Sequence, residues 1–408
     1  MADPRLYLPP SHSGERIHGL LQTLSLPRPT DIVPLASSAA FHRIYILSYP
    51  ASALQPHLPS QHFPSQISDT DLILRISGPH FTSIKTRNEI GFLKWVAQNT
   101  DVPVPEVVAY DATTNNELGH EFMITTRLRG VSFDGVREQL QAAGKAAQYE
   151  AHLSQFLLQM GDILEMLQRR TWSHIGGLQV RGPEDRDDAA AEIIVPGPVI
   201  DEQMWLQPEL ATIWGPHETH GSVNVGGPFA SYTESLGAEA DRHVHAIQRL
   251  SSLAALRQDL PRILAFRAAL REHAAQLNET RLILAHRDLH FGNVMWDPEG
   301  MRITGILDWE FAGVVPIQRW DPVRAFLWNC VEADESKVEK ARLAERVRES
   351  HGAFLEETRW SSPRQEHMQL AINFMRAIVQ VLPRGQIDRP WEKWRESMLE
   401  HIDHVCAD

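Results

Sequence analysis

The sequence predicts an α+β protein of two lobes, a small β-rich lobe followed by a larger, mainly helical lobe. Two observations favour this class: short strand-like runs with a single helix precede residue 127, and helical periodicity dominates from residue 131. We therefore place a leader at 1–27, an N-terminal lobe at 28–127 and a C-terminal lobe at 128–408. A chain of 408 residues is long enough for such a division.

The N-terminal lobe is expected to be a small sheet with one helix. Apolar residues recur at helical spacing only in 83–99, so this segment predicts the helix. A Pro- and Ser-rich loop interrupts the strands at 50–68. The expected strands begin at Asp31 and then cover 43–49, 71–77, 102–112 and 121–130.

The C-terminal lobe is predicted to be helical around one strand-rich segment. Residues 152–170 form a strongly amphipathic helical pattern, and further helices are expected at 238–252 and 260–277. Residues 180–227 are punctuated by Gly and Pro and predict a long irregular stretch. Long stretches of this kind in compact domains are usually functional or disordered.

The segment LAHRDLHFGNVMW (284–296) places charged and amide side chains between two apolar runs. The pattern predicts a strand, a polar turn and a second strand, and a returning strand, MRITGILDWE, ends at Asp308. Asp288, Asn293 and Asp308 are therefore expected to converge at one end of this hairpin. A single buried aspartate is often only a hydrogen-bonded core group, but three converging polar side chains favour a functional site.

The spacing H-R-D-L-x-x-x-N suits phosphoryl transfer. That chemistry needs a carboxylate to accept the proton of the attacking hydroxyl, for which Asp288 is the candidate. It also needs oxygen ligands that hold Mg²⁺ against the nucleotide phosphates, for which Asn293 and Asp308 are candidates. Gly292 allows the backbone bend that turns Asn293 back toward the metal.

The stretches HRDLHFGN and ILDWE resemble the core motifs of the aminoglycoside phosphotransferase and choline kinase family, in its fungal-type branch. His286 and His290 match the two histidines of that motif, and Arg287 replaces a commoner glycine. The resemblance implies a bilobal kinase-like fold, ATP and Mg²⁺ as cofactors, and transfer of the γ-phosphoryl group to a hydroxyl. It also implies that Asp321 braces the catalytic loop, although Asp321 is equally suited to capping a helix.

The resemblance continues less specifically into the N-terminal lobe. Arg75 resembles the third-strand cation that meets the nucleotide phosphates, and Glu89 resembles the helix glutamate that pairs with it. A solvent-exposed arginine and a solvated helix face are the alternatives for these two residues.

Two further segments are implied to contact the nucleotide. Backbone groups at Thr125, Thr126 and Arg127 are expected to meet the adenine. The first turn carries Ser37 and Ser38 where relatives usually have glycine, so small side chains and hydroxyls would have to serve the phosphates. This departure leaves tight nucleotide binding open and keeps a catalytically weak kinase-like binding protein as an alternative.

Composition limits the partners and the location. A net charge of −13 argues against nucleic-acid binding, which needs a basic face. Two distant cysteines, Cys330 and Cys406, exclude a disulfide framework, and no apolar run approaches a membrane span. We expect a cytoplasmic protein with no membrane partner; the oligomeric state is open.

The acceptor is predicted to be a small-molecule hydroxyl compound. No Ala-Pro-Glu segment follows Asp308, so the platform that protein kinases use for peptides is missing. An insertion at about 180–250 is expected to wall the acceptor pocket. Its aromatic and histidine residues are as well suited to core packing as to lining a pocket: Trp205, Trp214, His217, His220, Phe229 and Tyr232.

Overall fold

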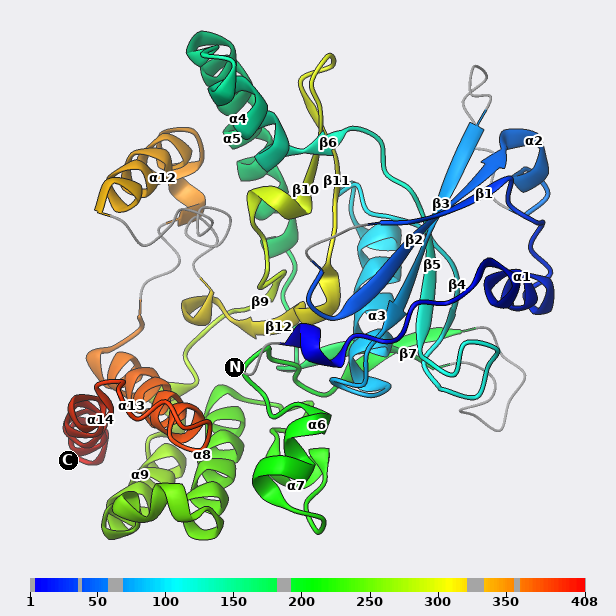
Figure 1. Cartoon of the computed structure of the whole chain (residues 1–408). Helices are drawn as coiled ribbons and strands as arrows, with labels where there is room; N and C mark the ends of the chain where they lie inside the picture. Colours follow the sequence, from blue (N-terminus) through cyan, green and yellow to red (C-terminus); the bar gives the residue numbers. More distant parts are fainter. Residues whose placement is uncertain are drawn as a thin grey trace.

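The protein has a sheet-rich lobe built from the first third of the chain and a larger helical lobe (Figure 1). This computed structural model describes residues 4–35, 39–57, 69–181, 192–320, 334–355 and 360–407. The predicted α+β class with two lobes is confirmed. No helix within these ranges has the length and apolarity needed to cross a membrane.

The N-terminal lobe contains a five-stranded antiparallel sheet in the order β1-β2-β3-β5-β4. Its strands are β1 (Asp31–Pro34), β2 (His42–Pro50), β3 (Asp69–Ser77), β4 (Val107–Asp111) and β5 (Phe122–Thr126). Alternation along β3 buries Leu72, Leu74 and Ile76 on one face. Helix α1 (Gly14–Thr23), within the predicted leader, packs on that face, and the short α2 (Ala51–Leu54) follows β2.

The opposite face of the sheet carries Arg75 and is covered by helix α3 (Ile84–Asn99). On its far side α3 packs against a hairpin of β7 (Gly177–Arg181) and β8 (Ile193–Gly197). Gly91 makes this contact possible, because a Cβ there would lie 2.7 Å from the carbonyl carbon of Leu178. Helix α3 therefore connects the sheet to the rest of the protein.

The prediction that 180–227 is irregular throughout was wrong. The strand β8 and the short helices α6 (Gln207–Glu209), η4 (Leu210–Trp214) and α7 (His220–Val223) lie within it. Strand β8 has the weak sequence IIVPG, and its order comes from pairing with β7, a contact that local periodicity cannot reveal. Strand β6 (Val131–Ser132) similarly exists through pairing with β10.

The helical lobe has two apolar cores. One surrounds α5, and the other joins α8, α9, α13 and α14. Helix α8 begins at Tyr232, before the predicted residue 238, because the Ser231 side chain caps it by accepting from the Glu234 N–H. The helices are α4 (Phe133–Ala142), α5 (Ala146–Gln168), α8 (Tyr232–Arg249), α9 (Leu260–Glu272), α10 (Ala274–Leu277), α12 (Asp334–Leu355), α13 (Pro363–Val381) and α14 (Trp391–Cys406).

Four short strands support the predicted catalytic segment: β9 (Leu282–Ala285), β10 (Val294–Asp297), β11 (Arg302–Ile306) and β12 (Gly313–Pro316). Strand β10 pairs with β11, as predicted, whereas β9 pairs with β12, a strand that the sequence did not predict. The β9–β10 loop and the β11–β12 loop consequently lie together. Five 3₁₀ segments complete the described structure: Pro4–Tyr7, Ser251–Asp259, Phe291–Asn293, Trp309–Phe311 and Ile317–Arg319.

Candidate active site

Backbone and histidine hydrogen bonds join the two loops that carry the predicted carboxylates. The Leu307 N–H donates to the Asn293 carbonyl at 2.8 Å. The fully buried His286 places Nε2 2.8 Å from the Leu307 carbonyl, and its Nδ1 accepts from the Asp288 N–H at 3.3 Å. Burial lowers the pKa of His286 to about 4, so the ring is neutral and donates through Nε2. His286 thus holds Asp288 and Asp308 in neighbouring positions.

Asn293 is oriented by Asp288. Its amide nitrogen donates to the Asp288 carbonyl at 2.9 Å and to Asp288 Oδ2 at 3.2 Å. These bonds leave the amide oxygen of Asn293 as the atom available to a ligand. Burial, followed by the charges of Asp308, Glu310 and Glu202, raises the pKa of Asp288 to about 8. His290 lies beside it, with Nε2 4.0 Å from Asp288 Oδ1 and Nδ1 accepting from the Gly292 N–H.

Asp308 occupies the left-handed region, with φ 66° and ψ 57°. Its Oδ1 accepts from Arg75 Nη2 at 2.9 Å, and Arg75 also pairs with Glu89 through Nη1. The Arg75 and Glu89 side chains are 15% and 4% exposed, so neither is the solvated residue of the alternative interpretation. Burial opposes ionisation of Asp308, but the Arg75 and Lys85 charges outweigh it and lower the pKa of Asp308.

A second buried ion pair, which the sequence analysis missed, crosses between the lobes. Lys85 Nζ lies 2.5 Å from Glu310 Oε2 and 2.8 Å from His42 Nε2. Asn88 on the same helix donates to the carbonyls of Glu310 and Ala312 at 3.1 and 2.9 Å. Lys85, Asn88 and Glu89 share one face of α3, so their helical spacing was an available signal.

His42, Glu89 and Glu310 stand close enough together for a metal, but cations already occupy their surroundings. Burial and the charges of Lys85 and Arg75 hold the pKa of His42 well below its ordinary value. The cluster is therefore a structural ion-pair network rather than a metal centre.

Residues 125–127, which are predicted to meet the adenine, are largely bonded within the sheet. The Thr126 N–H donates to the Glu106 carbonyl at 3.0 Å, and the Arg127 N–H donates to the Asp71 carbonyl at 3.1 Å. Thr125 pairs with Ile73 in the β3–β5 register, two positions from the Arg75–Met123 pair, so it lies on the strand beside Arg75. Ser37, Ser38 and Asp321 fall outside the described residues.

Arg287 performs a role that its sequence position did not suggest. Its φ of 70° lies in the region that favours glycine, the residue relatives more often carry there. The guanidinium compensates for this strain by donating to the Ile200 carbonyl at 2.6 Å and pairing with Asp201. Arg287 therefore ties the catalytic loop to the segment 199–205.

We expect Arg287→Gly to lower the free energy of unfolding despite removing backbone strain. The left-handed conformation costs a non-glycine residue roughly 1–2 kcal/mol, whereas each of two charge-assisted hydrogen bonds contributes about 1.5–3 kcal/mol. Urea denaturation of the variant measures the change in the free energy of unfolding. Arg287→Lys is the control, because it keeps the positive charge and loses the paired N–H donors of the guanidinium group. A glycine variant more stable than the native protein would contradict the role as a tie.

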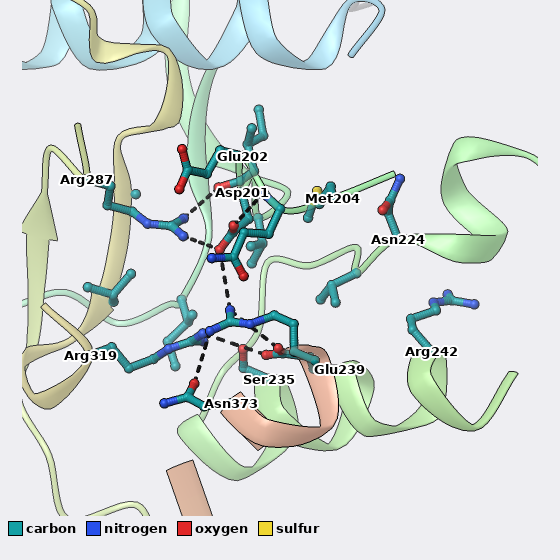
Figure 2. Close-up of a pocket in the computed structure, with 18 of the residues that line it drawn as sticks. Asp201, Glu202, Met204, Asn224, Ser235, Glu239, Arg242, Arg287, Arg319 and Asn373 are labelled. Atoms are coloured by element: carbon teal, nitrogen blue, oxygen red, sulfur yellow. Dashed lines mark hydrogen bonds and ion pairs between the residues drawn. The ribbon is translucent and has the colours of Figure 1, made fainter. Parts of the chain in front are cut away.

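A cavity of about 310 Å³ lies beside this tie, between segment 199–205, α8 and α13 (Figure 2). Of the aromatic and histidine residues predicted from the insertion, only Trp205 lines it. Tyr232 is buried in the helical core and its hydroxyl bonds Gln369, while Trp214 stacks on His245 with ring centroids 5.7 Å apart. The core interpretation therefore holds for these two rings.

This chain is similar to a family of phosphotransferases and to one curated fungal protein. The family model described as "Phosphotransferase enzyme family" matches residues 65–336. A curated fungal relative, the Clavilactone A biosynthesis cluster protein Y of Ampulloclitocybe clavipes, is 25% identical over 264 residues, which are 63% of this chain. The match spans about half of that relative, 55% of its length.

Solved structures resemble the whole chain at low identity. An aminoglycoside phosphotransferase in ternary complex with AMP-PNP and hygromycin B is 14% identical, with a TM-score of 0.46, and the match covers 96% of this chain and 98% of that one. An ethanolamine kinase of Plasmodium vivax is 10% identical, with a TM-score of 0.41, covering 95% and 86%. The macrolide 2'-phosphotransferase of Brachybacterium faecium is 13% identical, with a TM-score of 0.42, covering 94% and 96%.

Proposed function

This chain belongs to the phosphotransferase enzyme family, and from that premise we propose that it transfers the γ-phosphoryl group of ATP to a hydroxyl of a small molecule. The observation that carries the proposal is the meeting of two carboxylates and an amide, Asp288, Asp308 and Asn293, at the ends of two adjacent loops. This is the donor set that phosphoryl transfer requires.

Asp288 is assigned to the acceptor. In the reaction the acceptor oxygen bonds to the γ-phosphorus, the bond from phosphorus to the bridging oxygen of ADP breaks, and the acceptor proton passes to an Asp288 carboxylate oxygen. Burial and the neighbouring carboxylates raise the pKa of Asp288, which makes its ionised form a stronger base than an ordinary aspartate. His290 and Asn293 border Asp288 and limit its orientations.

Asn293 and Asp308 fit Mg²⁺ because both offer oxygen atoms, the ligands this hard cation prefers. The hydrogen bonds to Asp288 fix the amide nitrogen of Asn293 and leave its oxygen for the metal. Bound Mg²⁺ would neutralise phosphate charge that develops in the transfer. Arg75, held by Glu89, supplies a second positive charge for phosphate oxygens.

Titration calorimetry with ATP measures nucleotide binding, and the result distinguishes a phosphotransferase from a catalytically weak kinase-like binding protein. We expect ATP to bind clearly more tightly with Mg²⁺ than without it, because the oxygen atoms of Asp308 and Asn293 would hold the metal and its charge would offset that of the phosphates. ADP release in a metabolite screen then tests turnover. Equal heats with and without Mg²⁺, or none in either case, would instead favour the catalytically weak binding protein.

A further inference from the structure

The cavity beside Arg287 is placed to receive the acceptor. Arg287, on its wall, belongs to the catalytic loop and directly precedes Asp288, and Glu202 lies at the exposed edge of the cavity. Gly313 and Val314 of β12 form another part of the wall. A molecule in this cavity would therefore contact Arg287, the residue that directly precedes the carboxylate assigned to the acceptor.

Positive side chains predominate on this wall. Among the described lining residues, four arginines face three carboxylates, and one histidine adds a further ionisable group. The charged lining residues are Asp201, Glu202, Glu239, Arg242, His243, Arg287, Arg319 and Arg376. The acidic balance of the whole chain thus does not extend to the cavity.

Two of the three carboxylates are already neutralised by arginines. Asp201 pairs with Arg287 and lies 3.8 Å from Arg376, and Glu239 lies 3.7 Å from both Arg376 and Arg319 (Figure 2). Burial opposes ionisation of both carboxylates, but these charges outweigh it and hold the pKa of Asp201 well below its usual range and that of Glu239 at about 2. Neither carboxylate is available to an incoming ammonium group.

One aromatic residue of the wall, Trp205, is already paired with a cation. A quaternary or protonated amine is commonly bound over the face of an aromatic ring. The guanidinium of Arg384 already lies over the Trp205 ring, 4.4 Å from its centroid. The Trp205 ring thus already has one of the protein's own cations over it, while Phe311, Trp320 and Trp360 also line the cavity.

Helix α8 presents hydrogen-bond donors to the cavity. Arg242 donates through Nη1 to the Ser222 carbonyl at 2.8 Å, and in the described part of the chain no carboxylate pairs with it. His243 is 8% exposed, and its Nε2 faces Glu239 Oε1 at 3.7 Å, a contact that helps to lower the pKa of Glu239 but is too long for a good hydrogen bond. Buried ring nitrogens normally have a closer partner, so His243 is suited to meet a polar ligand atom.

We propose that the acceptor is a hydroxyl compound without ammonium groups, whose carboxylate or other oxygen atoms are bound by Arg242 and His243. The inference rests on the proposed phosphotransferase function and narrows its substrate class. Aminoglycoside and choline-like acceptors are disfavoured by it, because four arginines line the cavity and, among the described lining residues, only Glu202 at its edge has no arginine partner and could offset a further cation.

A three-part panel tests the class on the full-length protein. Choline and hygromycin B represent the amines, glucose and glycerol the neutral hydroxyl compounds, and glycerate and gluconate the hydroxycarboxylates. Each is assayed for ADP release with Mg²⁺ and ATP, and for a shift in thermal unfolding without ATP. We expect responses above background only from the neutral or carboxylate compounds.

The two readouts separate the failure of this inference from that of the proposed function. Stabilisation or phosphorylation by the amines in preference to the others would overturn the inference. Absence of any response in a protein that binds ATP would overturn the assignment of this cavity to the acceptor. Selective stabilisation by non-amines without ADP release would support the binding class while counting against the phosphotransferase activity.

A matched pair of variants locates the response. Arg242→Gln should raise the KM for the best non-amine compound roughly tenfold or more, the effect of losing a hydrogen bond from a charged group. The KM for ATP should stay unchanged. Arg249→Gln, on the same helix but outside the cavity, is the control and should change neither value. Equal behaviour of the two variants would remove Arg242 from the site.

Discussion

Replacing Asp288 by asparagine is expected to slow phosphoryl transfer by roughly 10²–10⁴-fold, the usual contribution of a general base. The amide keeps the shape of the carboxyl group and loses its basicity. Because Asp288 is assigned to the acceptor and not to the metal, we expect ATP affinity to change little. Single-turnover rates with an acceptor from the panel, together with calorimetry of ATP binding, measure the two quantities separately.

The control for this variant is Asp241→Asn, the same substitution at an exposed residue of α8 that pairs with Arg267. It should leave both rate and binding near the native values. Thermal unfolding shows whether Asp288→Asn remains folded, since Asn293 can still donate to the residue-288 carbonyl at its present 2.9 Å. A folded Asp288→Asn protein with native rates would remove Asp288 from the chemistry.

Replacing Asp308 by asparagine should reduce both Mg²⁺–ATP affinity and turnover. Even partners outside the first ligand shell change metal affinity by roughly 10–100-fold, so we expect at least that loss for a direct ligand. The backbone should be preserved, because asparagine adopts the left-handed conformation seen here more readily than most residues. Arg75 would keep its pair with Glu89.

Calorimetry as a function of Mg²⁺ concentration measures this effect. The native protein should show a strong dependence on Mg²⁺, and Asp308→Asn a weak one, whereas Asp288→Asn should resemble the native protein. If Asp288→Asn abolished nucleotide binding and Asp308→Asn left it intact, the roles assigned to the two carboxylates would be reversed.

Local sequence predicted much of the catalytic segment. The polar turn after Ala285 and the returning strand to Asp308 could be anticipated, because strand alternation and turn residues act over a few positions. Strand β12 could not, since GVVP is ordered by pairing with β9 about thirty residues earlier. The same holds for β8, which depends on β7.

The cross-lobe ion pairs mark the limit of sequence reasoning at the site. Spacing on α3 places Lys85 and Glu89 on one face, but their partners, Glu310 and Arg75, come from other elements. Burial strengthens these ion pairs and raises the pKa of Asp288. Burial arises only when elements distant in the sequence pack together. A sequence shows which charged residues are present, but it does not show which of them are buried next to one another.

By itself, the sequence determined the two-lobe α+β class and the order of carboxylate, amide and carboxylate along the chain, because periodicity and turn chemistry are local. Tertiary structure decided what those residues meet. Arg287 combines a glycine-like backbone conformation with side-chain contacts to Asp201 and the Ile200 carbonyl, which lie far from it in the sequence. The charge of the cavity likewise depends on arginines from α8, α13 and the catalytic loop, which long-range packing brings to one wall.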